Sequence, residues 1–442
     1  MRHYIKFNNL NIRGIPGSKI SLEINKGDIV AVTGPTGAGK STLVGYIAGI
    51  VRPDNIGTVL IDGLDPFSQL DERKIHRMCG IVSQDPDQDI VFNSVLKDVV
   101  FAPENIGLDK QRISRRAGNY FKHFKLGKTK KRDFDQISLS EKQRTVLSSE
   151  LIMHQDILIL DDAVSMQDSE SAYSILKSVI SAARKRKQTV IFVSQRYKEI
   201  ELADKIIELK DGEASYKSIG ELSSILPDRE EVQGEPVPGL NFLIGKGKVK
   251  RGSEDPDNMM GETAIDMADV FFSYGKDTII KELYCRFCRG TEYHITGKSG
   301  SGKTTFLKLL AGINQERSGS INRMGRTALA MQLPSEQLFE DTVIEDVMYQ
   351  KRLLGVPKPD ARRAAETMLT NLGIAKTKWE KHPLKLSMGE QRLVLLAGVF
   401  LADADIILLD KPYAGLDTDG YYKVRYYIEE MLKEGKCVIV VD

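Results

Sequence analysis

The sequence predicts an α/β fold in two tandem copies, each a largely parallel sheet covered by helices. The same phosphate-binding loop occurs twice, as GPTGAGKST at 34–42 and GKSGSGKTT at 297–305. Apolar strand-like runs alternate with helical stretches around both loops, which is the pattern of parallel sheets. The length of 442 residues suits two or three domains of ordinary size, and two copies of one domain satisfy it.

Each loop stands in the context that its chemistry needs, after an apolar run and before a helix-like one. Glycines let successive backbone N–H groups curve around phosphate oxygens, and the helix N-terminus adds positive partial charge. The lysine reaches the terminal phosphates, and the following Ser or Thr binds Mg²⁺. The residues predicted to bind nucleotide are Gly34, Thr36, Gly37, Gly39, Lys40, Ser41 and Thr42 in the first loop, and Gly297, Ser299, Gly300, Gly302, Lys303, Thr304 and Thr305 in the second.

Later landmarks repeat at a nearly constant offset, which extends the duplication beyond the loops. The pairs are Gln84 with Gln332, Ser140 with Ser387, Asp161 with Asp410, and the strand 189–194 with 437–442, at offsets of 248, 247, 249 and 248 residues. The two loop lysines differ by 263. The second copy is therefore 15 residues shorter between its loop and its Gln, and we expect a trimmed peripheral sheet there.

The boundary between the copies lies in an irregular segment. Residues 227–257 hold four prolines, several glycines and mixed charges without a sustained period, which indicates a linker or an irregular connector. We predict a first domain at 1–226, a linker at 227–261 and a second domain at 262–442. In the repeat alignment the chain stops at Asp442, one residue before the second switch residue, so we expect that domain to be C-terminally incomplete.

The composition limits the classes of partner. Lys and Arg number 63 against 61 Asp and Glu, so the net charge of +2 gives no global reason for a polyanionic partner. Basic clusters at 128–132 and 184–187 allow a nucleic-acid interpretation, but the second ends a helix, where cations suit the dipole, and no nucleic acid is expected. Four cysteines are too few for a disulfide framework, and neither a signal segment nor a run of 18 apolar residues occurs, so we expect a cytoplasmic setting.

The order of motifs is the same in both halves: a phosphate loop, a Gln, a segment resembling LSGGQ, an apolar strand ending in Asp, and a D-loop. This order resembles ATP-binding cassette (ABC) ATPases over nearly the whole chain outside the linker. The resemblance implies a helical subdomain beside each sheet, ATP and Mg²⁺ as cofactors, and cassettes paired head to tail, within the chain or between two chains. Each site would join the loop of one cassette to the signature of the other. The implied Mg²⁺ ligands are Ser41, Gln84 and Asp161 in one cassette, and Thr304, Gln332 and Asp410 in the other.

The segment after each Gln narrows the resemblance. QDPDQ at 84–88 and QLPSEQ at 332–337 both place Pro two residues after the Gln, which looks like the ATPase subunits of energy-coupling-factor importers and of related cobalt and nickel uptake systems. Those families import vitamins or transition-metal ions through a separate integral-membrane coupling subunit. The implied partner is such a subunit, docked beside these segments, and the implied location is the cytoplasmic face of the cell membrane. A turn common to many ABC importers is the alternative explanation of the Pro.

The site built on Lys40 would receive Ser387 and Gly389 from the signature LSMGE of the second half. Asp162 stands where the family has a catalytic Glu and is one methylene shorter, so we expect slow turnover, because a misplacement of about 1 Å can cost on the order of 10²-fold. Gln195 stands where the family usually has the switch His, and it can bind phosphate but cannot titrate. Asp162 and Gln195 are the catalytic candidates.

The site built on Lys303 would face a signature read as LSEKQ at 139–143, which keeps Ser140 but has neither glycine. Lys411 stands in the position of the catalytic Glu, and a lysine protonated at neutral pH is no general base. Tyr274 matches the adenine-stacking aromatic of the family, with a core residue on a strand face as the alternative. We therefore expect this site to bind nucleotide without hydrolysing it.

Three functions fit this pattern. The leading one is the energy-coupling ATPase subunit of an importer, with weak hydrolysis at the Lys40 site only. A second is a regulatory or decayed module that binds nucleotide without turnover. A third is a soluble tandem cassette acting in translation, which resembles the chain less, because those proteins have long charged helical linkers and keep the catalytic Glu in both halves.

Overall fold

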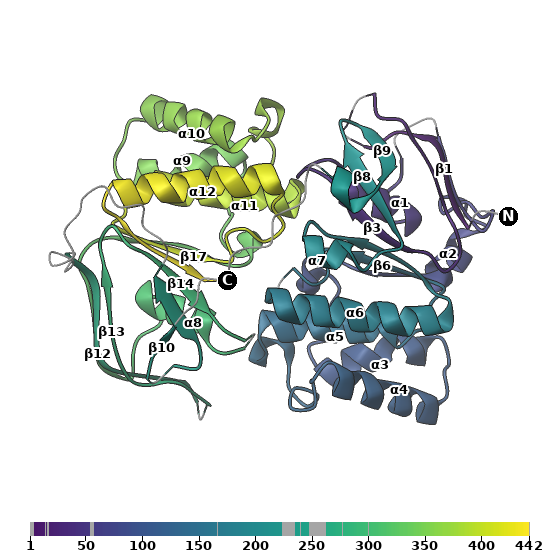
Figure 1. Ribbon diagram of the computed structural model, residues 1–442, viewed down its shortest axis with the longest axis horizontal. Helices are drawn as coiled ribbons and strands as arrows, with labels where there is room; N and C mark the ends of the chain where they lie inside the picture. The colour runs from purple at the N-terminus through teal and green to yellow at the C-terminus, as the bar shows by residue number, and fades with distance from the viewer. Residues whose placement is uncertain are drawn as a thin grey trace. The chain divides into compact units, whose positions relative to one another are not determined.

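The computed structural model describes residues 4–13, 15, 17–53, 57–165, 167–222, 235–238, 240–246, 262–275, 277–298 and 300–441. The chain forms two compact units, 1–228 and 229–442. Each unit contains one six-stranded sheet and one three-stranded antiparallel sheet, with helices on both sides of the larger sheet (Figure 1). The predicted α/β fold in two tandem cassettes is confirmed.

The large sheet of the first unit has the strand order β5-β6-β7-β3-β8-β9. Its first five strands are parallel, and β9 runs antiparallel to β8 at the edge. The small sheet has the order β2-β1-β4. The strands are β1 (Ile5–Leu10), β2 (Ile20–Ile24), β3 (Ile29–Thr33), β4 (Thr58–Ile61), β5 (Cys79–Val82), β6 (Ile157–Asp161), β7 (Thr189–Val193), β8 (Lys205–Lys210) and β9 (Glu213–Lys217).

Strand β3 is uniformly apolar because both of its faces are buried. Ile29 and Ala31 point into a core formed with four helices, while Val30 and Val32 point into a second core formed with α1 and the small sheet. The four helices are α3 (Val95–Asn105), α4 (Lys110–His123), α5 (Leu139–Leu151) and α6 (Ser169–Arg186). The other helices are α1 (Lys40–Ile47), α2 (Glu72–Met78) and the short α7 (Tyr197–Ile200).

The large sheet of the second unit has the order β10-β11-β14-β18-β17-β16, and the small sheet β13-β12-β15. The strands are β10 (Glu235–Pro236), β11 (Leu243–Lys246), β12 (Thr263–Tyr274), β13 (Asp277–Cys288), β14 (Glu292–Thr296), β15 (Ser318–Arg323), β16 (Thr327–Ala330), β17 (Ile406–Asp410) and β18 (Cys437–Val441). The helices are α8 (Lys303–Leu310), α9 (Val343–Leu353), α10 (Lys358–Leu372), α11 (Met388–Leu401) and α12 (Thr418–Lys433). Within the described residues of either unit, no helix is both long and apolar enough to cross a bilayer.

The shortening of the second unit removes a helix, not a strand. Both small sheets keep three strands, so the expectation of a trimmed peripheral sheet is wrong. In the first unit α2 lies between β4 and β5, whereas only residues 324–326 separate β15 from β16. The counterpart of α2 is therefore what the described part of the second unit lacks.

Part of the predicted linker belongs to the second sheet. Of residues 227–261, the structure describes 235–238 and 240–246, and these form β10 and β11 instead of an irregular connector. Strand β11 pairs antiparallel with β14, on the side where β8 pairs parallel with β3 in the first unit. Phe242, just before β11, is buried and its ring packs 5.3 Å from that of Phe306 in α8. The connector thus completes the sheet that carries the second phosphate loop.

Candidate nucleotide-binding sites

The first phosphate loop joins β3 to α1 and depends on two glycines. Gly34 and Gly39 have φ angles of 142° and 91°, which residues with a side chain rarely adopt. A Cβ at Gly34 would lie 2.0 Å from the carbonyl oxygen of Leu209 in β8, and one at Gly39 would lie 2.4 Å from Ile12. The backbone of the loop therefore packs tightly against Leu209 and Ile12, which holds the loop in the curved shape that binds phosphate.

The second loop, between β14 and α8, has the same geometry with different supports. Gly297 and Gly302 have φ angles of 157° and 99°. A Cβ at Gly297 would lie 2.8 Å from the Cβ of Phe242, and one at Gly302 would lie 2.5 Å from Ile279. Phe242 therefore packs against the first glycine of the second loop, as Leu209 of β8 packs against the first glycine of the first loop. Among the predicted nucleotide-binding residues, Ser299 lies outside the described residues.

Both loop lysines are held within their loops. Lys40 Nζ donates hydrogen bonds to the carbonyl oxygens of Gly34 and Pro35 at 2.7 and 2.8 Å. Lys303 Nζ donates to the carbonyl oxygens of Gly297 and Lys298 at 2.6 and 3.2 Å. Each ammonium group lies beside the N-terminus of the following helix, where it adds to the positive potential that binds phosphate.

The hydroxyl and carboxylate groups predicted to bind Mg²⁺ are brought together in both units. Ser41 Oγ donates to Asp161 Oδ1 at 3.1 Å, and Thr304 Oγ1 donates to Asp410 Oδ2 at 2.6 Å. Burial raises the pKa of both carboxyl groups, and these hydrogen bonds oppose the rise. Asp410 Oδ1 is buried without a hydrogen-bond partner among the described residues. Oxygen ligands of this kind fit Mg²⁺, which is usually held by one or two carboxylates together with substrate phosphates.

The catalytic candidate of the first unit contacts the predicted Gln. Gln84 Nε2 donates to Asp162 Oδ2 at 2.8 Å. Burial raises the pKa of Asp162 to about 7, and Arg196 opposes this rise. A carboxylate with a pKa near the working pH is suited to accept a proton from an attacking water.

Asp162 and Lys411 occupy the same backbone position in the two units. Both follow the last residue of a central strand, β6 or β17, and both have left-handed φ angles, of 51° and 48°. Gln195, after β7, is 9% exposed, and its Oε1 has no hydrogen-bond partner among the described residues. The two units therefore place different side chains, a carboxylate and a lysine, at one shared backbone position.

The structure pairs the signature residues differently from the sequence offset. Ser387 is the N-cap of α11 and forms a capping box with Glu390. In the first unit the N-cap of α5 is Ser138, which forms the same box with Glu141. The counterpart of Ser387 is therefore Ser138, and the assignment of Ser140 to this role is wrong. The S-x-x-E spacing of a capping box was the signal in the sequence that locates it.

With Ser138 as the counterpart of Ser387, the signature of the first unit is ISLSE at 137–141 instead of LSEKQ at 139–143. This segment also lacks both glycines. Glu141 matches Glu390, so its charge does not distinguish the two signatures. Lys142 is paired with Asp87 at 2.7 Å. Leu139 and Ser140 in place of the glycines remain the difference from the family pattern.

Two further residues were missed by the sequence reasoning or left open by it. Arg392 in α11 is 1% exposed and donates to the carbonyl oxygens of Lys411 and Gln332 at 3.0 and 2.8 Å, so it ties together two predicted site segments. Its signal in the sequence was a charged residue that directly precedes the apolar run 393–401 of α11. Tyr274 is 50% exposed at the end of β12, and its hydroxyl accepts from Asn314 Nδ2 at 2.9 Å. The alternative that Tyr274 is a core residue is therefore wrong.

The loops, the hydroxyl and carboxylate pairs and the capped signature helices define a nucleotide-binding cassette in each unit. The ABC transporter family matches residues 18–165 and 280–414. The chain belongs to this family of ATPases. The matched segments contain both phosphate loops and both central strands that end in Asp.

Similar proteins extend over most of the chain. A protein of Bifidobacterium longum named as an ABC transporter ATP-binding protein is 27% identical; the alignment covers 96% of this chain and spans 60% of that protein. One of Methanosarcina mazei with the same description is 26% identical, over 96% of this chain and 85% of its own. The solved structure of ribosome-bound archaeal Pelota and ABCE1 is similar with a TM-score of 0.68 and 22% identity, over 98% of this chain and 73% of that one. At that identity the similarity shows the fold alone.

Proposed function

We propose that the chain is the ATP-binding, energy-coupling subunit of an ABC importer of the vitamin or transition-metal class, with one site that hydrolyses ATP and one that only binds it. The observation that carries the asymmetry is the shared left-handed position, which holds Asp162 in contact with Gln84 in one unit and Lys411 in the other. In this proposal two ATP bind at composite sites, each joining one phosphate loop to the signature of another cassette, which belongs to the same chain or to a second one.

At the Lys40 site the residues of the chain have separate tasks. Lys40 and the loop N–H groups bind the terminal phosphates, and Ser41 with Asp161 would hold Mg²⁺, which when bound neutralises charge on the phosphates. Gln84 orients the attacking water, and Asp162 accepts its proton. Because Asp162 is short and buried, turnover is slow.

At the Lys303 site the corresponding residues bind ATP without hydrolysing it. Thr304 and Asp410 provide the corresponding Mg²⁺ ligands. Lys411 cannot accept a proton at neutral pH, and its positive charge favours bound ATP over a site that has lost the γ-phosphate. The half-exposed ring of Tyr274 is available to stack on adenine. This site therefore acts as a nucleotide clamp.

We assign the contact with a membrane subunit to the loops that follow Gln84 and Gln332. In the first unit Val91 and Phe92 are exposed there by 63% and 37%, and in the second Phe339 is exposed by 61% with its ring against Tyr349. Exposed apolar side chains at corresponding places of both cassettes suit a helix of an integral-membrane coupling subunit. Such a contact would place the chain at the cytoplasmic face of the membrane.

Two other functions are distinguished by experiment. A tandem cassette acting in translation would have the same fold as the ribosome-bound protein, and at 22% identity the similarity to that protein concerns the fold alone. A nucleotide-binding module without turnover is supported by Leu139 and Ser140 in the first signature and by Lys411.

The test of asymmetry is steady-state phosphate release from the purified chain, with Lys40→Ala and Lys303→Ala as matched variants. Turnover abolished by Lys40→Ala and retained by Lys303→Ala supports one hydrolysing site; no turnover above either variant supports the non-hydrolysing module. The importer role is tested by affinity purification from cells that also express the neighbouring genes. Recovery of a small integral-membrane protein supports it, and recovery with ribosomes alone overturns it.

A further inference from the structure

One segment of the first unit concentrates the positive charge of the chain. Residues 110–132 contain ten Lys and Arg and no Asp or Glu. The rest of the chain holds the other 53 Lys and Arg against all 61 Asp and Glu, so it is net acidic. We call this segment, which comprises α4 and the loop that follows it, the basic face.

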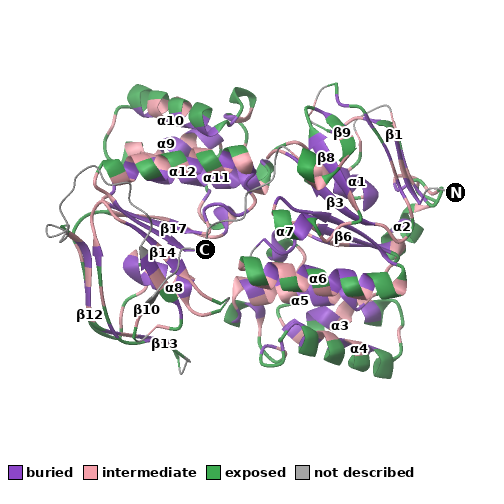
Figure 2. Ribbon diagram, viewed as in Figure 1, coloured by how far each residue is buried: buried purple, intermediate pink, exposed green. Residues whose placement is uncertain are grey.

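The charges of the basic face point to solvent. On α4 the apolar side chains Ile113, Ala117 and Phe121 are buried in the core, which turns the charged residues outward (Figure 2). Seven exposed cations form no ion pair with any residue that the structure describes: Lys110, Arg112, Arg115, Lys122, Lys125, Lys128 and Lys131. Such an uncompensated cluster repels itself unless an anionic partner covers it.

A second basic element joins this face. Arg186 at the end of α6 donates to the hydroxyl of Tyr120 in α4 at 3.3 Å, so the cluster 184–187 lies next to the basic face. Burial lowers the pKa of Arg116, and the positive charge of Arg112 lowers it further.

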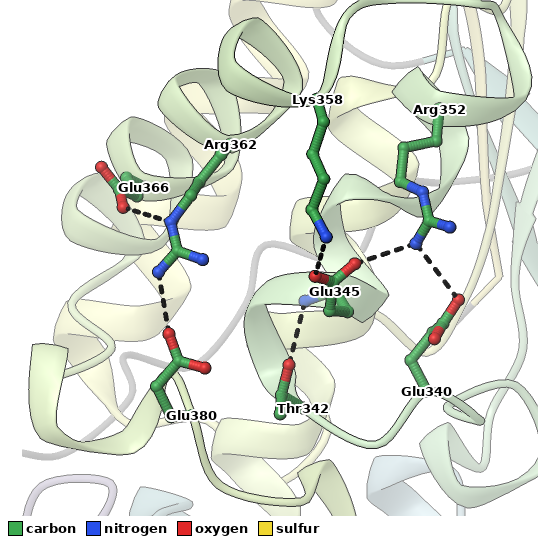
Figure 3. Close-up of polar contacts among 8 residues, drawn as sticks. All are labelled: Glu340, Thr342, Glu345, Arg352, Lys358, Arg362, Glu366 and Glu380. Atoms are coloured by element: carbon green, nitrogen blue, oxygen red, sulfur yellow. Dashed lines mark hydrogen bonds and ion pairs between the residues drawn. The ribbon is translucent and has the colours of Figure 1, made fainter.

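The corresponding segment of the second unit, 358–380, is far less basic, with five Lys and Arg against three Asp and Glu. Figure 3 shows Lys358 paired with Glu345 at 3.1 Å, and Arg362 paired with Glu366 and Glu380 at 3.0 and 2.8 Å. Helices α4 and α10 begin 248 residues apart. At that offset the three acids of the second unit are replaced in the first by Lys97, Gly118 and Arg132. The two copies therefore share these helices and differ in the charge that the helices carry.

We infer that the basic face binds the anionic headgroups of the membrane leaflet beside which the cassette works. Four to eight Lys and Arg on one face suit an acidic lipid surface, where each contributes about 1 kcal/mol. The apolar side of α4 is buried in the protein, so the binding is electrostatic adsorption without insertion. This goes beyond the proposed importer role, and its test needs neither nucleotide nor a coupling subunit, so either claim can fail alone.

Nucleic acid is the less suitable partner because the aromatic residues of the segment are not available. Proteins that bind single strands stack bases on exposed aromatic side chains. Here Phe121 and Phe124 are each 3% exposed, and the hydroxyl of Tyr120 is hydrogen-bonded to Arg186 and to His154 Nε2. Flexible lysines without stacking platforms fit a fluid layer of phosphate headgroups better.

The experiment is sedimentation of the full chain with vesicles of phosphatidylcholine alone or with one third phosphatidylglycerol. The test variant carries four Lys→Gln changes, at Lys122, Lys125, Lys128 and Lys131. The control variant carries the same loss of charge in the second unit, at Lys351, Lys358, Lys376 and Lys381. Unfolding midpoints are compared first, because exposed substitutions of this kind change stability by only about 0.5 kcal/mol.

The wild type and the control variant are expected to bind acidic vesicles, with affinity that falls as salt rises, and to ignore neutral ones. The test variant is expected to bind on the order of 1,000-fold more weakly, because each of the four lost charges contributes about 1 kcal/mol. No binding of the wild type to acidic vesicles, or an equal loss in both variants, overturns the inference. Tighter, equally charge-dependent binding to polyuridine at the same phosphate concentration also overturns it, in favour of nucleic acid.

Discussion

Replacing Asp162 with Asn separates the charge of this side chain from its hydrogen bond. The Asn carbonyl oxygen can still accept from Gln84 Nε2, which lies 2.8 Å from Asp162 Oδ2. Asn also tolerates the left-handed backbone, with φ 51°, that this position requires. The only large change is the loss of a group that accepts a proton, and removing a positioned base lowers kcat by about 10²- to 10⁴-fold, or about 2.7–5.4 kcal/mol of activation free energy.

The assay is steady-state phosphate release together with the ATP dissociation constant from a binding titration. For Asp162→Asn we expect kcat to fall at least about 100-fold while the dissociation constant changes by less than about threefold, because a group that acts only in the transition state does not contribute to ground-state binding. Lys411→Asn is the matched change in the second unit and is expected to leave kcat within about twofold. Retention of more than about a tenth of kcat by Asp162→Asn would refute the assignment of the base.

Further predictions concern the supports of the two sites and their response to pH. Phe242→Ala removes a buried ring that packs against the second phosphate loop, so it should lower the free energy of unfolding by about 3–5 kcal/mol. In a Lys40→Ala background it should also weaken nucleotide binding at the second loop. Unchanged binding would exclude that Phe242 supports this loop. Ser138→Ala removes the cap of α5 and should lower the free energy of unfolding by about 1 kcal/mol. A urea titration measures this loss, and Ser387→Ala, which removes the cap of α11, should cause a similar one. No loss in either variant would reject the pairing of Ser138 with Ser387. Burial raises the pKa of Glu150 from 4.5 to about 7, so the fold holds a proton that the unfolded chain releases, and stability is lost as pH rises through this window. Glu150→Gln stays neutral and should therefore gain up to about 3 kcal/mol over the wild type between pH 5 and pH 8; an equal difference at both pH values would contradict the burial.

Most of the fold was predictable because its signals are local. A glycine-rich loop between an apolar strand and a helix requires one backbone geometry, and the structure has it at Gly34 and Gly39 as at Gly297 and Gly302. Uniformly apolar strands such as β3 indicated a parallel sheet buried on both faces. The family resemblance placed Ser41 and Asp161 in one site, and they are in contact in the structure, whereas the contact of Gln84 with Asp162 was not predicted.

The two main errors have different causes: a local capping signal was overlooked, and a pairing between distant segments leaves no local signal. The match of LSEKQ to the signature placed Ser140 opposite Ser387, whereas helix capping selects Ser138, because the N-cap is fixed by the first turn of α5. The connector looked irregular because β11 is short and its partner β14 lies about 50 residues further along the chain. Pairing over such a separation depends on an open sheet edge, which no local pattern reveals.

The proposed function requires that one of two bound nucleotides is hydrolysed. The direct measurement saturates the chain with radiolabelled ATP, stops the reaction after a single turnover and counts the ADP and ATP retained per chain. We expect one ADP and one ATP per chain for the wild type, and two ATP for Asp162→Asn. Two ADP per chain in the wild type, or none, would overturn the proposal.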